Sequence, residues 1–119
     1  MKTVYLIRHA KSSWKEAGMR DFDRPLNKRG LKDAPNMGRR MVSRNQLPEL
    51  IIASEAERAQ TTAKLIAEQL PNGSFELEIS AELYHSSPNT ILSIINKVDN
   101  RFKSLAIVCH NPGISQLNY

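Results

Sequence analysis

The chain has only one cysteine, Cys109, and no long hydrophobic run. A lone cysteine excludes an intrachain disulfide. No apolar stretch approaches the ~20 residues that a membrane-spanning helix needs. A secretory signal is also lacking, because Met1-Lys2-Thr3 leads into only four apolar residues before Arg8. We therefore expect a cytoplasmic protein without a membrane partner.

Several motifs that mark ligand sites are absent as well. The glycines form no Gly-x-x-x-x-Gly-Lys loop, so P-loop nucleotide binding is not indicated. The histidines show neither His-x-His nor His-Glu-x-x-His spacing, so we expect no metal site. A thiol phosphatase needs an arginine soon after its cysteine, and none follows Cys109. We interpret Cys109 as a buried, small apolar residue.

The net charge of +5 is unevenly distributed. Residues 1–44 hold twelve lysines and arginines against four acids, whereas residues 45–119 hold five against eight. A basic half suits an anionic ligand, although most of these side chains are interpreted as a solvated helix face. No helix-turn-helix, zinc-finger or RNA-binding motif is present, so we expect no nucleic acid partner.

Apolar runs rich in valine, isoleucine and leucine predict strands near residues 2–7, 49–53, 75–79 and 104–109. The first, second and fourth runs alternate little between apolar and polar residues. Continuous apolar strands separated by helices indicate a parallel sheet covered on both faces. The chain therefore predicts an α/β fold, a three-layer α/β/α sandwich with a mostly parallel sheet, in a single domain over residues 1–119.

Helical patterns fill the gaps between these strands, over residues 31–44, 56–70 and 88–98. Asn27 is a possible cap for the first helix, and Ser87-Pro88 opens the third. Pro35 either restarts the first helix or kinks it. The apolar face expected for the first helix is Leu31, Ala34, Met37, Met41 and Val42. The face expected for the second is Ala59, Thr62, Ala63, Ile66 and Leu70. The third carries a broad stripe of Ile91, Leu92, Ile94, Ile95 and Val98.

Two segments stand apart from this pattern. Residues 14–25 are polar and irregular, and a loop of that length in a compact domain is usually functional or mobile. We expect it to cover the site. Asn111-Pro112-Gly113 reads as the start of another helix, which the sequence leaves unfinished. We therefore expect the domain to be C-terminally incomplete, without a last helix and strand.

Residues suited to phosphate chemistry follow three of the predicted strands. Arg8-His9 ends the first, Ser54 to Arg58 follow the second, and His110 follows the last. Ligand sites in α/β sheets lie beyond the carboxyl ends of the strands. If these strands are neighbours, two arginines can hold a phosphoryl group through charge-assisted hydrogen bonds while an imidazole attacks phosphorus. Ser54 has no acid-base partner at a suitable spacing, so we expect it to bond the backbone of its loop.

These motifs resemble those of the histidine phosphatase superfamily, also called phosphoglycerate-mutase-like. The matching segments are Leu6-Ile7-Arg8-His9-Ala10-Lys11, Ser54-x-x-x-Arg58-Ala59-x-x-Thr62-Ala63, Val108-Cys109-His110-Asn111-Pro112-Gly113, Arg24-Pro25-Leu26 and Arg29-Gly30. Arg-His-Ala-Lys together with His-Asn-Pro-Gly in a compact chain is most similar to the SixA-type phosphohistidine phosphatase branch. The resemblance implies that the last helix and strand of that branch are missing here.

The resemblance implies that His9 becomes phosphorylated and that Arg8, Arg58 and His110 bind the phosphoryl group, with no metal and no cofactor. The expected activity is hydrolysis of a phosphoryl group from a phosphohistidine protein or a phosphorylated small molecule. Larger family members use a Glu or Asp as proton donor, and Glu82 is the nearest equivalent along the chain. His85 is interpreted as a rim residue. The alternatives are a non-catalytic anion-binding regulatory module and a phosphomutase-like enzyme.

Overall fold

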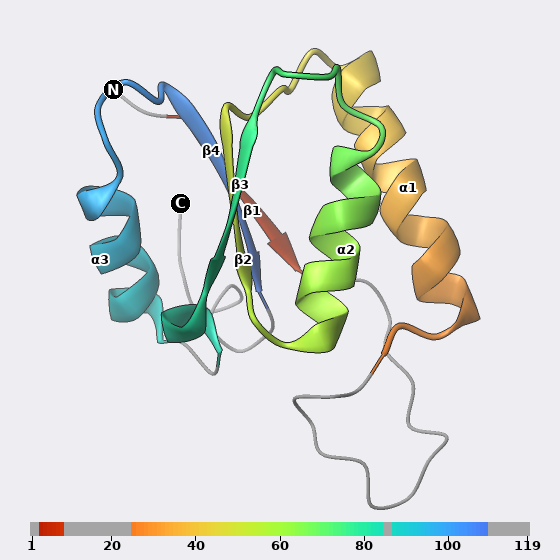
Figure 1. Cartoon of the computed structure of the whole chain (residues 1–119), viewed down its shortest axis with the longest axis horizontal. Helices are drawn as coiled ribbons and strands as arrows, with labels where there is room; N and C mark the ends of the chain where they lie inside the picture. Colours follow the sequence, from red (N-terminus) through yellow and green to blue (C-terminus); the bar gives the residue numbers. More distant parts are fainter. Residues whose placement is uncertain (1–2, 9–24, 85–86, 110–119) are drawn as a thin grey trace, which may run out of the picture.

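The computed structural model of the chain describes residues 3–8, 25–84 and 87–109 (Figure 1). Its elements in chain order are β1 (Thr3–Arg8), α1 (Lys28–Ser43), β2 (Leu50–Ser54), α2 (Glu57–Ala67), β3 (Glu76–Ser80), the short 3₁₀ helix η2 (Ala81–Leu83), α3 (Pro88–Lys97) and β4 (Ser104–Cys109). The four predicted strands and three predicted helices all form, with boundaries within a few residues of those expected.

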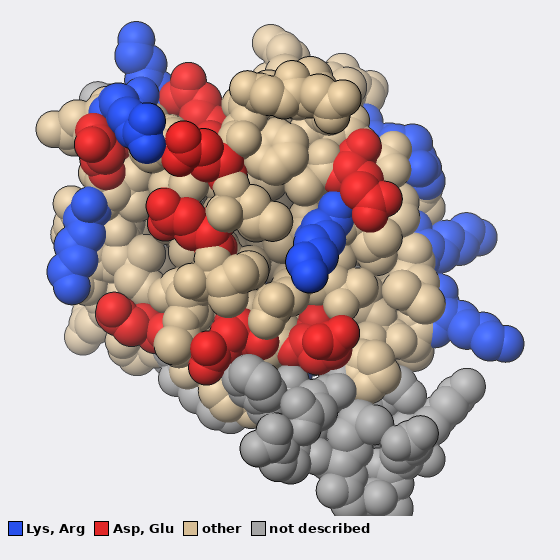
Figure 2. All heavy atoms as spheres, in the orientation of Figure 1, with Lys and Arg blue, Asp and Glu red and all other residues tan. Residues whose placement is uncertain are grey.

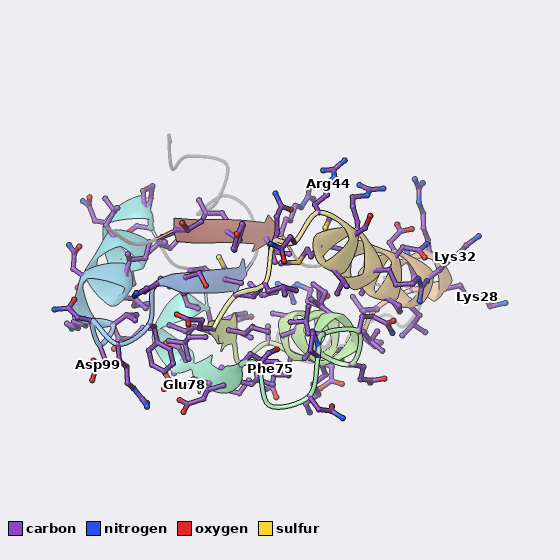
Figure 3. All side chains as sticks on the ribbon, turned by 90° about the horizontal axis from the view of Figure 1, so that it is seen from above. Lys28, Lys32, Arg44, Phe75, Glu78 and Asp99 are labelled. Carbon is purple, nitrogen blue, oxygen red and sulfur yellow. The ribbon has the colours of Figure 1, made fainter. Side chains whose placement is uncertain are left out.

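The strands build one four-stranded sheet in the order β1-β4-β2-β3. All three strand pairs are parallel. The helices α1 and α2 cover one face of the sheet and α3 covers the other, as Figures 1 and 3 show. The prediction of a three-layer α/β/α sandwich with a parallel sheet is therefore confirmed for the described residues.

Alternate residues of the central strands fill two separate cores. Ile51, Ala53, Ala106 and Val108 belong to the core under α1 and α2. Leu50, Ile52, Leu105 and Ile107 belong to the core under α3. Every residue of β2 is buried, which explains why its sequence is apolar without alternation.

Helix α1 begins as predicted, because the side chain of Asn27 accepts a hydrogen bond of 2.8 Å from the backbone N–H of Gly30. One helix runs across Pro35, so a new start at that residue is wrong. The expected apolar face needs a larger correction. Leu31, Met37 and Val42 are exposed, and the buried residues are Gly30, Ala34, Gly38 and Met41.

Close approach of two helices explains this difference. A Cβ atom added to Gly38 would lie 2.8 Å from the backbone oxygen of Ile66 in α2. Small residues on α1 therefore let the two backbones meet, and the larger apolar side chains stay outside the contact.

The other two helices follow the sequence more closely. All five residues of the face expected for α2 are buried. Ser87 caps α3, since its hydroxyl oxygen accepts a hydrogen bond of 3.2 Å from the N–H of Thr90. Only Ile91 of the expected stripe is fully buried, and Leu92 is exposed. No helix in the described ranges is long and apolar enough to cross a membrane.

Candidate active site

The carboxyl ends of three neighbouring strands meet at one edge of the sheet. Arg8 and Cys109 are register partners at the ends of β1 and β4, and Val108 pairs with Ala53, next to Ser54 at the end of β2. Adjacent strands lie about 4.8 Å apart. The sequence-based condition that these strands be neighbours is thus met. His9 and His110, which follow Arg8 and Cys109 in the sequence, lie outside the described residues, as do His85 and most of the 14–25 segment.

Arg8 is exposed at the end of β1 and borders a small cavity of about 80 Å³. The cavity lies between this strand and the two helices of the same face, since Asp33 of α1 and Thr62 of α2 also line it. Asp33 forms an ion pair with Arg29, with a nitrogen–oxygen distance of 3.5 Å. Arg8 thus borders a cavity whose other lining residues are mostly apolar.

Arg58 lies in the first turn of α2 and is 3% exposed. A charged side chain is rarely so buried unless other groups compensate its charge. The backbone oxygen of Arg58 accepts a 2.7 Å hydrogen bond from the Thr62 hydroxyl one turn later. This bond ties Thr62 to the first turn of α2, which follows the carboxyl end of β2.

The turn between β2 and α2 positions this arginine. The hydroxyl oxygen of Ser54 accepts a hydrogen bond of 3.3 Å from the backbone N–H of Ala56, and the Gln60 side chain donates to the backbone oxygen of Glu55 at 2.6 Å. The structural role expected for Ser54 is confirmed. Because α2 begins three residues after the end of β2, the partial positive charge of its N-terminus lies at the same edge. Ala56 provides no side-chain cap, and Glu57 is the acidic residue of the first turn.

Glu82 also lies at the carboxyl edge, but on the other side of the sheet. It belongs to η2, directly after β3, and its side chain is exposed. It lines an open groove of about 290 Å³ on the α3 side, together with Glu78 and Ser80 of β3. Two strands separate β3 from β1. A catalytic role for Glu82 stays a prediction.

Cys109 and the distribution of acidic and sulfur side chains can be described, whereas all three histidines lie outside the described residues. Cys109 is fully buried, as the sequence predicts. In the part of the chain that the structure describes, no three His, Cys, Asp or Glu side chains gather as a metal site would require.

The sequence reasoning overlooked the position of two residues at this edge. Thr62 stands in the quoted motif and on the apolar face expected for a helix, and it also lines the cavity beside Arg8. Asp33 of α1 lines the same cavity. The signal for Thr62 was present, since it recurs four residues after Arg58 in the motif quoted above; Asp33 offered none.

Comparison with known proteins identifies the family. The sequence model of the histidine phosphatase superfamily (branch 1) matches residues 4–86. The crystal structure of a protein from Agrobacterium tumefaciens, assigned as the phosphohistidine phosphatase SixA, superposes with a TM-score of 0.89 at 34% identity. It covers 98% of this chain and 74% of that one.

Two curated relatives are uncharacterized proteins. One, from Mycobacterium tuberculosis, is 31% identical over 93% of this chain and 66% of its own length. The other, a chloroplastic protein of Arabidopsis thaliana, is 41% identical over 58% of this chain. The present chain thus spans about two thirds of the first relative and 32% of the second. Because the family model matches well over half of its residues, the chain belongs to the histidine phosphatase superfamily, branch 1.

Proposed function

We propose that this chain is a metal-independent phosphatase that works through a covalent phosphohistidine on His9. The observation that carries the proposal is the register pair Arg8 and Cys109. Two adjacent parallel strands end together there, and each is followed in the sequence by a histidine. Each histidine is therefore the next residue in the sequence after a strand that ends at this edge of the sheet.

The arginines supply the anion-binding part of the site. Arg8 is exposed at the strand end, and Arg58 is held in the first turn of α2. Guanidinium groups bind phosphoryl oxygens through two parallel hydrogen bonds. Each hydrogen bond to a charged group contributes about 1.5–3 kcal/mol. The uncapped start of α2 adds partial positive charge at the same edge.

The first chemical step transfers the phosphoryl group to the protein. The lone pair of a neutral His9 nitrogen forms a bond to phosphorus, and the bond from phosphorus to the leaving oxygen or nitrogen breaks. The leaving group takes that electron pair and one proton. Arg8, Arg58 and protonated His110 stabilise the charge on the equatorial phosphoryl oxygens.

The second step returns the free protein. Water attacks phosphorus, the phosphorus–nitrogen bond of His9 breaks, and its electron pair returns to the imidazole. The proton lost by water passes to a base at the site, and inorganic phosphate leaves. Glu82 is the proposed acid and base for ester substrates, since their alkoxide leaving groups need a proton most.

We further propose phosphohistidine as the physiological substrate class. The likeness to the SixA structure from Agrobacterium tumefaciens supports this assignment. A phosphohistidine leaving group protonates readily on its ring nitrogen, so it places a smaller demand on Glu82 than an ester does. A cytoplasmic location would bring the enzyme together with such phosphoproteins.

Phosphate release tests the proposal. A phosphohistidine peptide, a sugar phosphate and p-nitrophenyl phosphate would be compared for the wild type and for Arg8→Ala, with and without EDTA. We expect EDTA-insensitive turnover that is fastest on phosphohistidine and falls about 10- to 100-fold in Arg8→Ala, which loses one or two charge-assisted bonds. Arg44→Ala removes an exposed arginine beyond α1 (Figure 3) and should leave the rate unchanged.

The same assay separates the alternatives. A folded chain that phosphate protects against thermal unfolding but that releases no phosphate from any substrate would be a binding module. Transfer of the phosphoryl group to a second hydroxyl on a sugar, in place of release to water, would identify a mutase.

A further inference from the structure

Strand β3 forms an open border of the sheet in the described structure. It pairs with β2 on one side only, and four of its five residues are exposed. An edge strand presents unpaired backbone N–H and C=O groups to which another extended segment can bind. Beside this border lies the 290 Å³ groove, between β3 and α3.

One end of the groove lies at the same edge of the sheet as the candidate active site. Ser80 and Glu82 line one part of it, at the carboxyl edge, and Ser80 is the register partner of Ser54 at the end of β2. Asp99 and Phe102, which precede β4, line the opposite part. A segment lying along the groove would therefore lie alongside β3. One of its ends would be near the carboxyl ends of β2 and β4, which precede Arg58 and His110 in the sequence.

The backbone of β3 is oriented for such pairing. The N–H of Glu76 donates to the backbone oxygen of Glu49 at 2.9 Å. In a parallel pair only alternate residues bond to a given neighbour. Glu76, Glu78 and Ser80 therefore bond toward β2, and the backbone groups of Leu77 and Ile79 point to the open border.

The two sides of β3 differ in chemistry. Glu76 and Glu78 pair in register with Leu50 and Ile52 and thus face the α3 side, toward the groove. Leu77 and Ile79 face the other side, and both apolar side chains are exposed, by 37% and 44%. An added strand would meet carboxylates on one side and open apolar surface on the other.

Charge indicates the occupant. Glu78, Glu82 and Asp99 line the groove together with two cations, Lys97 and Arg101. Arg101 forms an ion pair with Glu76 at 3.3 Å, so four acidic side chains at the groove and along β3 face two cations. Figure 2 shows several acidic side chains on the face that carries β3, with fewer Lys and Arg side chains among them, and Figure 3 shows Glu78 and Asp99 far from Lys28 and Lys32 of α1. The surface therefore complements lysine or arginine side chains.

The same charges disfavour a second copy of this chain as the occupant. In an antiparallel pair of two β3 strands centred on Glu78, the two Glu78 side chains would stand directly opposite each other. Like charges in opposite positions destabilise strand pairing. A parallel pair in register would align both glutamates of each strand.

We propose that an extended basic segment of a phosphorylated protein binds as an added strand along β3 and delivers its phosphorylated side chain to the carboxyl edge. Only the catalytic part of this inference rests on the proposed phosphatase function; the binding of the segment along β3 does not. The substrate class is then a phosphorylated residue next to a stretch that alternates basic and apolar residues. Its basic side chains would meet Glu76 and Glu78, and its apolar side chains would cover Leu77 and Ile79.

Binding tests the surface independently of catalysis. The probe is a fluorescent, unphosphorylated peptide that alternates lysine and valine, titrated with the full chain and followed by anisotropy. We expect saturable binding that weakens about three- to tenfold in Glu78→Lys, since an exposed charge pair contributes little and reversal replaces attraction by repulsion. Glu68→Lys makes the same charge change at the exposed end of α2, in the opposite layer, and should bind like the wild type.

A second probe separates strand addition from plain charge attraction. The same peptide, N-methylated at alternate residues, keeps its charge but loses backbone donors, and we expect it to lose most of its affinity. Equal affinity of the methylated peptide, or equal binding by Glu78→Lys and the wild type, would overturn the proposal. A dimer of this chain that the peptide displaces would overturn it too, because the second copy would then be the occupant of β3.

Kinetics then link the surface to turnover. Phosphohistidine peptides with lysine-valine and glutamate-valine flanks would be compared on the wild type and on Glu78→Lys. We expect a lower KM for the basic peptide, a three- to tenfold loss of that preference in the variant, and an unchanged rate on p-nitrophenyl phosphate. A wild type that hydrolyses both peptides with the same KM contradicts the surface, while a wild type that hydrolyses nothing but binds the peptide contradicts only the phosphatase function.

Discussion

Arg8 and Cys109 occupy equivalent positions at the ends of two hydrogen-bonded parallel strands. Arg8 is exposed there, whereas Cys109 is fully buried. This pair fixes where the chain can place the two sequence motifs that contain His9 and His110. The consequences for binding, stability and chemistry can be measured one residue at a time.

Arg58→Ala should weaken binding of vanadate, a phosphate analogue, about 10- to 100-fold, because one or two charge-assisted hydrogen bonds are lost. Inhibition of phosphate release measures this effect. Arg40→Ala, an exposed arginine near the end of α1, is the matched control and should be inhibited like the wild type.

Because Arg58 is buried, its replacement can also disturb folding. Circular dichroism would verify that the variant is folded, and Arg58→Lys provides a second test. Lysine keeps the charge but not the planar fork of donors, so intermediate affinity is expected. Unchanged vanadate inhibition in a folded Arg58→Ala would show that the side chain does not bind the anion.

Ser54→Ala should lower stability and leave the chemistry intact. The hydroxyl satisfies the buried N–H of Ala56, and leaving such a donor without a partner costs about 1–3 kcal/mol. Urea unfolding measures the loss. Phosphoryl labelling of the protein should persist in this variant, and its disappearance would point to Ser54 as the nucleophile in place of His9.

Glu82→Gln should discriminate between leaving groups. Hydrolysis of an alkyl phosphate should slow by about 10²-fold or more, because general acid catalysis typically contributes that much. Hydrolysis of phosphohistidine should change little. Equal rates of the wild type and variant on both substrates would remove Glu82 from the mechanism and leave it as an exposed carboxylate of the groove.

Gly38→Ala should destabilise the contact between α1 and α2. The new methyl group would lie 2.8 Å from the Ile66 oxygen and 3.0 Å from Gln69 side-chain carbons. Overpacking of this kind costs about 1–3 kcal/mol, measurable by urea unfolding. Lys32→Ala, at an exposed position of the same helix, should be neutral or slightly stabilising, since alanine favours helix. Equal stability of both variants would show that the helices can separate without cost.

The sequence predicted the strands well because their chemistry is simple. Residues 50–53 and 105–109 are apolar without alternation, and burial on both faces of a parallel sheet is the reason. The helix caps at Asn27 and Ser87 could also be predicted, because each side chain accepts a hydrogen bond from the backbone N–H three residues ahead.

The face of α1 could not be predicted in the same way. Apolar periodicity predicts burial of large residues such as Leu31 and Met37. The contact with α2 instead buries small residues such as Gly38, because the two helix backbones lie close together. Strand order is also a property of the whole fold. The sequence placed functional residues at strand ends, but only the structure shows that β4 lies between β1 and β2. The groove beside β3 likewise depends on α3 and the segment before β4, which no local pattern links.

The most direct test of the account is phosphoryl trapping on the wild type and on His9→Ala. Each protein would be mixed with a labelled phosphodonor, quenched briefly in acid and analysed under alkaline conditions, because phosphohistidine survives base and hydrolyses in acid. The account predicts base-stable label on the wild type, none on His9→Ala, and no phosphate release by the variant. Label or steady-state phosphate release that persists in a clean His9→Ala preparation would contradict it.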